Sequence, residues 1–404
     1  MELLKLCLVF AVIIAILRAK KPLFTAILSG AAAAVLLYRI PFRDTAVLTI
    51  TALTSWSTLS VVLSFYVVTF LQRMLEKRRR LRGAREALDG IFNNRRVNAS
   101  LTPAIIGLLP SAGAMNICGA MVDSACGDYL TPEDKAFVTS YYRHIPESFL
   151  PTFSAILIGL TLSGCSAGSF VLAMLPMVAA LFLLGYLFYL RKLPKKVDGQ
   201  GKLSSKSKRA EFKQFVLSLW TLMMVVGLII VFNLPVYIVT PLVILMNFFI
   251  DRFTIREVLP MVRTAFEPAI IFNTFLIMVF KDIITYTGII HQLPEVFSRL
   301  PVSPFLIFVL IFFAGTIISG SNAIIALCMP MAIAAVPDAG IPLIIAVMCS
   351  AYAAMQISPT HICLFVAVEY FHVPIGSLIR RTIPVISCFL LIVLVYCRVL
   401  GLIL

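Results

Sequence analysis

The amino-acid sequence predicts an all-α polytopic membrane protein with about ten transmembrane helices in two inverted five-span repeats, each containing a re-entrant helical hairpin. Three observations predict this fold. Hydrophobic residues make up 60% of the 404 residues and charged residues only 13%, which leaves too few polar side chains to cover a soluble surface. Most basic residues gather in short segments between apolar runs. Short motifs of the first half recur in the second half at a nearly constant offset.

The net charge of +15 lies mostly in two short segments. Residues 73–96 carry a net charge of +6, and residues 191–213 carry +7. Basic blocks beside apolar runs are typical of cytoplasmic loops, where they also attract anionic lipid head groups. The composition and the placement of charge therefore exclude a nucleic-acid binder, a secreted disulfide scaffold and a disordered chain.

Ten apolar runs are long enough to cross about 30 Å of hydrocarbon. They lie near residues 3–17, 22–38, 55–75, 142–162, 168–190, 214–232, 236–250, 265–285, 341–371 and 382–402. Two further apolar stretches, 101–127 and 303–336, are interrupted by Gly, Pro, Ser and Asn near their middles. Such interruptions predict hairpins that enter the membrane and turn back. The alternative for the first stretch is two ordinary helices joined by a surface loop.

The basic residues give the expected orientation. When both chain ends are placed outside, the cytoplasmic segments hold 28 of the 34 Lys and Arg residues. By the positive-inside rule, this asymmetry favours a multi-pass protein of the cell membrane, inner or plasma, with extracytoplasmic N- and C-termini.

The two halves of the chain share motifs at corresponding points. Asn116 recurs as Asn322 at an offset of 206, and Pro151-Thr152 recurs as Pro359-Thr360 at an offset of 208. Because each half contains five spans, the second half enters the membrane from the opposite side, as in the inverted repeats of many secondary transporters. The expected units are a first repeat over 1–191, a basic cytoplasmic linker over 192–213 and a second repeat over 214–404.

Polar groups concentrate at the two hairpin tips and at an unwound segment after each hairpin. A broken helix leaves free N–H groups that suit a carboxylate or oxyanion, and free carbonyl groups that suit a cation such as Na⁺. Proline should unwind the two following spans, so that breaks and tips enclose one site. The candidate substrate-binding residues are Ser111, Gly113, Asn116, Thr152, Ser319, Gly320, Ser321, Asn322, Thr360 and His361.

Ionisable and polar residues near these tips are candidates for ion coupling. Asp123 follows the first tip by two helical turns, and Ser358 lies in the second break, so both are candidate coupling residues. His144 and Glu147 lie at the first break, with the cytoplasmic membrane boundary as an alternative position. We expect Na⁺ or H⁺ as the coupling ion and no other cofactor.

Motifs of enzymes and metal sites are weak in this sequence. Gly164-Cys165-Ser166-Ala167-Gly168 fits the G-x-S-x-G pattern of hydrolases, but it joins two apolar helices where that motif needs a strand followed by a helix. The nine cysteines form no C-x-x-C pair and are expected to be small buried hydrophobic residues. We therefore expect no catalytic residue and no metal site.

Three segments resemble a family of uncharacterised integral membrane proteins, domain of unknown function 401. They are GLLPSAGAMNICGAMVD, YRHIPESFLP and MQISPTHICLFVAVEYF, and the resemblance extends over roughly residues 40–400. The family is similar to the ion transporter superfamily, which includes gluconate, citrate and dicarboxylate carriers and arsenite and sodium/proton exchangers. The resemblance implies helical hairpins, inverted repeats and elevator-like alternating access, but no substrate.

The function expected from these observations is secondary active transport of a small, carboxylate-like organic anion in symport with Na⁺ or H⁺. A cation/proton exchanger that uses Asp123 or His361 is the alternative within this class. From other classes, an intramembrane serine hydrolase built on Ser166 and a non-transporting membrane scaffold remain open. The expected partners are the lipid bilayer and the anion, without nucleic acid, and a homodimer is left open.

Overall fold

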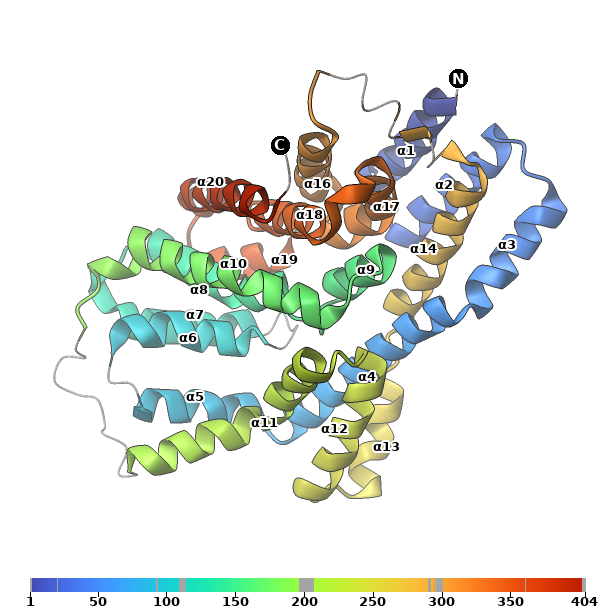
Figure 1. Ribbon diagram of the computed structural model, residues 1–404. Coiled ribbons are helices and arrows are strands. Elements are labelled where there is room, and N and C mark those ends of the chain that lie inside the picture. Colours follow the sequence, from blue (N-terminus) through green and yellow to red (C-terminus); the bar gives the residue numbers. More distant parts are fainter. Residues whose placement is uncertain are drawn as a thin grey trace.

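The computed structural model describes residues 2–19, 21–91, 94–108, 114–195, 207–289, 292–293, 295, 301–359 and 361–401. Within these ranges the secondary structure is helical and includes no β-strand. Figure 1 shows the helices arranged in two groups, here called the flanking group and the hairpin group. The fold class predicted from composition and charge is therefore confirmed as an all-helical membrane protein.

The flanking group contains the helices that precede the hairpin in each half of the chain. Its members from the first half are α1 (Glu2–Arg18), α2 (Leu23–Leu37), α3 (Phe42–Thr54), α4 (Trp56–Lys77) and α5 (Arg80–Ile91). Its members from the second half are α11 (Lys208–Phe232), α12 (Val236–Ile250), α13 (Ile255–Thr264) and α14 (Pro268–Tyr286). The two halves pack against each other within this group, because α14 contacts α2, α3 and α4, and α11 contacts α5. Helix α5 lies within residues 73–100, which were expected only as a cytoplasmic segment.

The hairpin group contains five helices from each half. The first five are α6 (Arg95–Ile106), α7 (Ala114–Cys126), α8 (Pro132–His144), α9 (Ser154–Ser163) and α10 (Ala167–Phe188). The second five are α16 (Pro304–Ser319), α17 (Ser321–Ala335), α18 (Gly340–Met355), α19 (Ile362–Tyr370) and α20 (Ile375–Val399). Each helix of the second set begins 207 to 209 residues after its counterpart in the first set. Whole helices therefore recur along the chain at nearly the same spacing as the short motifs.

The apolar stretches 303–336 and 101–127 each contain two antiparallel helices that contact each other. Helices α16 and α17 are separated only by Gly320, whose φ of +83° is a conformation that residues with a Cβ rarely adopt. Helices α6 and α7 contact each other in the same way, although α6 begins at residue 95, before the expected stretch. Close packing depends on Gly107, because a Cβ there would lie 1.9 Å from the carbonyl oxygen of Arg143.

The two expected breaks are present. The run 142–162 contains the end of α8, a 3₁₀ turn at Ile145–Ser148 and then α9, and the run 341–371 contains α18, a non-helical segment and then α19. The hairpins and broken helices of the two halves exchange contacts, since α17 packs against α9 and α7 packs against α19. This exchange places the middle of the hairpin group between the two halves of the chain.

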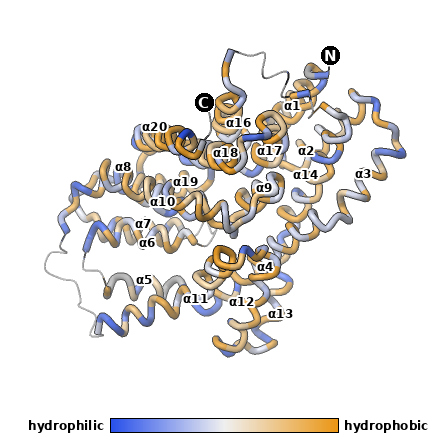
Figure 2. Tube along the Cα trace, viewed as in Figure 1, coloured by the Kyte–Doolittle hydropathy of each residue, from blue (hydrophilic) through white to orange (hydrophobic). Residues whose placement is uncertain are grey.

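The surface is apolar over much of the molecule. Large hydrophobic side chains are exposed on several helices, with Leu36 at 76%, Phe42 at 88% and Val231 at 72%. Figure 2 shows hydrophobic residues along most helices and hydrophilic residues mainly near helix ends. Among the described residues, six helices are long and apolar enough to cross a membrane, in α4, α10, α11, α14, α18 with the turn before it, and α20. The predicted number of about ten spans stays a prediction.

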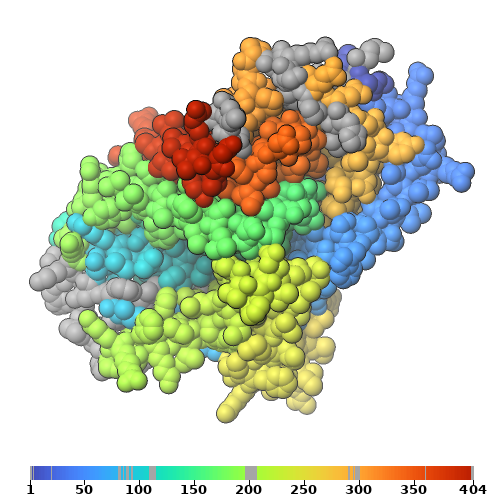
Figure 3. All heavy atoms as spheres, in the orientation of Figure 1, coloured from blue at the N-terminus to red at the C-terminus, as the bar shows by residue number. Residues whose placement is uncertain are grey.

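Ion pairs connect neighbouring helices near their ends. Arg78, after α4, donates two hydrogen bonds to the Glu257 carboxylate on α13, at 2.8 and 3.1 Å, and these bonds lower the pKa of Glu257 to about 2. Asp134 on α8 forms an ion pair with Arg381 on α20, with 3.1 Å between the Asp134 Oδ1 and Arg381 Nε atoms. In Figure 3 the green atoms of α10 lie between α20 and α11, and α10 contacts both helices.

Candidate functional site

A polar cavity of about 420 Å³ lies where the second hairpin meets both broken helices. Its wall includes the end of α16, Gly320 and the first turn of α17, together with residues from the breaks that follow α8 and α18. The lining residues that carry polar side chains are Glu147, Ser154, Thr316, Ser319, Ser321, Asn322, Tyr352, Ser358 and His361. A cavity of this size can hold a small organic molecule.

The first turn of α17 presents backbone N–H groups to this cavity. The first α-helical bond of α17 is donated by Ile324 to the carbonyl of Gly320, at 3.3 Å, and the N-cap Gly320 provides no side-chain cap. The N–H groups of Ser321, Asn322 and Ala323 precede that bond, and all three residues line the cavity. An uncapped helix N-terminus carries partial positive charge and favours an anion.

The side chains around this turn already make some hydrogen bonds. Ser154 of α9 donates to the Asn322 amide oxygen at 3.1 Å, which joins the first half of the chain to the second hairpin. Ser319 donates to the Gly315 carbonyl at 2.7 Å, and Ser358 donates to the Ile317 carbonyl at 3.2 Å. The hydroxyl of Thr316 is fully buried and has no hydrogen-bond partner within the described part of the chain. A ligand in the cavity could supply that partner.

An ion pair lies at the first break. Arg143 donates to the Glu147 carboxylate at 2.9 Å, and the arginine side chain is only 1% exposed. Glu147 lines the cavity and its side chain is 15% exposed. His144 is fully buried within the protein and Glu147 nearly so, and their position relative to the cytoplasmic membrane boundary stays a prediction. Burial of both charges is tolerable only because they are paired.

The two breaks meet through their histidines. His144 at the end of α8 and His361 before α19 approach to 2.9 Å between their Nε2 atoms. His361 also lines the cavity, whereas His144 lies behind it. His361 was a candidate from the sequence, but its contact with His144 was not predicted, because 217 residues separate the two.

The structure brings together five of the ten candidate substrate-binding residues and one of the two coupling candidates. Gly320, Ser319, Ser321, Asn322 and His361 line the cavity, as does Ser358 from the coupling set. That is five substrate-binding candidates and one coupling candidate on a single wall. Thr152 is buried beside the first break but does not line the cavity. The remaining candidates Ser111, Gly113 and Thr360 lie outside the described residues.

Two candidates lie elsewhere. Asn116 is exposed on the first turn of α7 and is not among the residues that line the cavity. Asp123 lies near the other end of α7, where Lys135 contacts its carboxylate at 2.7 Å and its side chain is 50% exposed. Asp123 is not among the residues that line the cavity, and its coupling role stays a prediction.

The sequence Gly164–Gly168 forms a turn between two helices. Gly164 ends α9 in a left-handed conformation with a φ of +67°, and Ser166 caps α10 by accepting a bond of 3.1 Å from the Ser169 N–H. The helix before the turn stands where a nucleophile elbow requires a strand. Ser166 therefore has a capping role, and the geometry does not favour hydrolysis.

The fold and the cavity define the class of this protein as a polytopic helical membrane protein with a polar cavity between helical hairpins and broken helices. The chain belongs to the family described as Protein of unknown function (DUF401), which it matches over residues 3–401. The resemblance found in the sequence is thereby confirmed. Among curated proteins, none matches the chain.

Two solved structures are similar to this fold. The MtrF protein of Neisseria gonorrhoeae, described with a class of antimetabolite efflux pumps, has a TM-score of 0.52 and 16% identity, covering 86% of this chain and 82% of its own. The YdaH transporter of Alcanivorax borkumensis has a TM-score of 0.49 and 15% identity, covering 89% and 88%. At these identities the likeness concerns the fold alone.

Proposed function

We propose that this protein is a secondary transporter that moves a small, carboxylate-like organic anion in symport with Na⁺ or H⁺. The observation that carries the proposal is the uncapped N-terminus of α17, which opens into a polar cavity between the two halves of the chain. The free N–H groups of Ser321 to Ala323 and the Asn322 amide would bind a carboxylate, and the Thr316 hydroxyl would bind a second polar group of the substrate.

The glutamate on the cavity wall does not oppose this assignment. Glu147 would repel an anion if its charge were free, but Arg143 pairs with it at 2.9 Å. The carbonyl oxygens at the end of α16 and the hydroxyl of Ser358 lie beside the same cavity and are ligands that suit Na⁺. A cation bound by these groups would lie next to the anion, and the two opposite charges would stabilise each other.

Alternating access would come from movement of the hairpin group relative to the flanking group. The two groups alternate along the chain, and corresponding helices of the hairpin group begin 207 to 209 residues apart. This spacing and the exchanged contacts of α17 with α9 and α7 with α19 support two inverted repeats. A rigid hairpin group that carries the cavity across the membrane is the elevator-like mechanism we propose.

Uptake by the purified protein in liposomes is the direct test. We expect accumulation of a labelled carboxylate only when a Na⁺ or H⁺ gradient is imposed, with a panel of mono-, di- and tricarboxylates as substrates. Because the similar MtrF structure is described with efflux pumps, gradients of both directions should be imposed. If no carboxylate moves in either direction under either gradient, the proposed function is wrong.

Asp123→Asn in the same assay tests the coupling prediction, since the substitution should change the ion dependence of uptake more than the substrate affinity.

The orientation is a separate proposal. We place residues 192–213 in the cytoplasm and Gly164–Gly168 outside, with both chain ends extracytoplasmic, on the basis of the charge asymmetry. In a variant without native cysteines, a cysteine at position 202 should react with an impermeant maleimide only after the cells are opened. Labelling of this position in intact cells would contradict the orientation and the inverted repeat together.

Exchange of a cation for protons is the second candidate function. It is favoured by the presence of Glu147 on the cavity wall, since a carboxylate there can bind either a cation or a proton. In this case Na⁺ movement would be driven by a pH gradient without any organic anion. The liposome assay distinguishes the two, because symport requires the carboxylate and exchange does not.

A further inference from the structure

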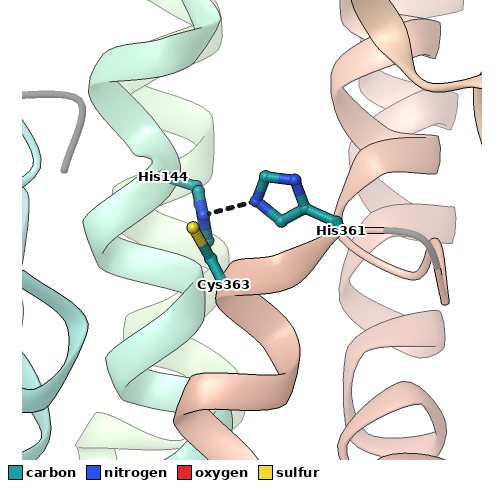
Figure 4. A group of neighbouring side chains, drawn as sticks. All are labelled: His144, His361 and Cys363. Atoms are coloured by element: carbon teal, nitrogen blue, oxygen red, sulfur yellow. Dashed lines mark hydrogen bonds between the residues drawn. The ribbon is translucent and has the colours of Figure 1, made fainter. Parts of the chain in front are cut away.

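Three side chains that can bind a metal ion converge where the two breaks meet. They are His144, the last residue of α8, His361, just before α19, and Cys363 in the first turn of α19. One ligand atom from each, a ring nitrogen or the sulfur, lies within 4.8 Å of the other two. Figure 4 shows the thiol of Cys363 beside the His144 ring and the His361 ring pointing toward both.

The His144 ring is held in the orientation that a metal ligand needs. It is fully buried, and its Nδ1 atom lies 2.6 Å from the Ser140 carbonyl oxygen. A proton on Nδ1 that is donated to this carbonyl leaves the lone pair of Nε2 directed toward His361. Metal-ligating histidines commonly have this backbone hydrogen bond on the other nitrogen, because it fixes the tautomer and the ring orientation.

We propose that His144, His361 and Cys363 bind one transition-metal ion that favours imidazole and thiolate, Zn²⁺ or Cu⁺. Two imidazoles and one thiolate are a ligand set that both ions accept. The ion would connect the end of α8 to the start of α19 and so hold the two broken helices together. This role is structural and does not depend on the proposed transport function.

A small movement would make room for the ion between the two imidazoles. Zn–N bonds of about 2.0–2.1 Å in tetrahedral geometry place two ring nitrogens roughly 3.4 Å apart. The two Nε2 atoms are 2.9 Å apart, so they must separate by roughly 0.5 Å. His361 can move by this amount because it lies in the non-helical segment between α18 and α19. It also lines the cavity, which gives the ion an entry path.

The charges around the cluster are compatible with a cation. Arg143 is the nearest positive group along the chain, and its guanidinium is paired with Glu147 at 2.9 Å. Binding would convert the Cys363 thiol to a metal-bound thiolate and release its proton to the solvent in the cavity. The thiolate would then balance the whole charge of Cu⁺ or half the charge of Zn²⁺.

The test uses the full-length protein purified in detergent with an affinity tag that contains no histidine. Co²⁺ serves as a spectroscopic substitute for Zn²⁺, and Zn²⁺ and Cu⁺ are then titrated against chelators of known affinity. We expect one ion per chain and an absorption band from thiolate-to-cobalt charge transfer. Cys363→Ser should abolish the band, and His361→Ala should weaken binding by more than about 100-fold, because loss of a supporting hydrogen bond alone costs about 10- to 100-fold.

Matched controls separate this site from adventitious binding. Cys388→Ser removes a partly buried thiol on α20, and His372→Asn removes an exposed imidazole while keeping a residue that tolerates its φ of +54°. Both controls should bind like the wild type, and both should unfold at a higher temperature when Zn²⁺ or Cu⁺ is added. Cys363→Ser and His361→Ala should lose this thermal shift.

Three results would overturn the proposal. They are the absence of stoichiometric binding in the wild type, binding that survives in both Cys363→Ser and His361→Ala, and equal losses in the two control variants. His144→Ala is a further ligand variant, but it leaves a void at a fully buried position, which lowers the stability of the fold. The partly exposed His361 therefore provides the decisive imidazole variant, and monodisperse elution with cooperative unfolding shows that it is folded.

Discussion

Replacing Arg143 by Met is expected to lower the free energy of unfolding by about 3 kcal/mol, more than other single charge removals in this protein. Arg143 is 1% exposed and pairs with Glu147 at 2.9 Å. Removal of one partner from a buried ion pair leaves the other charge uncompensated, which typically costs about 3–5 kcal/mol. The lower end applies here because Glu147 borders the cavity, where water can hydrate its carboxylate. The thermal unfolding midpoint in detergent is the measurement.

A second substitution distinguishes loss of the pair from loss of packing. The double variant with Arg143→Met and Glu147→Gln keeps neither charge of the pair. It should regain most of the stability that Arg143→Met alone loses. Glu76→Gln is the control, since it removes an exposed pair with Arg73 on α4 and should cost less than about 1 kcal/mol. An Arg143→Met midpoint equal to that of this control would show that the pair does not stabilise the fold.

Much of the fold could be predicted because its determinants are local in sequence. Glycine at the tip of the second hairpin and proline in the two breaks interrupt apolar runs in ways that a simple span does not need. The offset of about 207 residues was visible in short motifs, and the helix starts have the same spacing. By contrast, the helical structure of α5 was not predicted, because its basic residues suggested only a solvent-exposed segment.

The candidate site was only partly predictable, because its key contacts join distant residues. The hairpin residues from Ser319 to Asn322 were identified from polar groups in an apolar stretch, and they line one cavity. The contact between His144 and His361 and the nearby Cys363 depend on how α8 and α19 pack, which no local pattern specifies. The position of Asn116 could not be predicted from a local pattern either. Its motif resembles that of Asn322, but Asn116 is not among the residues that line the cavity.

Replacing Asn322 by Ala is expected to reduce anion uptake by roughly 10- to 100-fold while the protein remains folded. A hydrogen bond to a charged group contributes about 1.5–3 kcal/mol, and each 1.4 kcal/mol corresponds to tenfold in affinity. Asn322 is exposed to the cavity, and within the described part of the chain its side chain hydrogen-bonds only to Ser154, so its loss removes little packing. Initial rates of uptake in liposomes at several substrate concentrations would show the loss.

Two further asparagine variants make the Asn322→Ala result specific. Asn273 on α14 belongs to the flanking group, and Asn273→Ala should leave uptake unchanged because its amide oxygen has no hydrogen-bond partner among the described residues. Asn116→Ala tests the other hairpin tip, where the repeat predicts a corresponding loss even though Asn116 lies outside the cavity wall. If Asn116→Ala is silent and Asn322→Ala is not, the anion is bound by the second hairpin alone. If Asn322→Ala transports as well as Asn273→Ala, the anion does not bind at the start of α17, and the site proposed here is wrong.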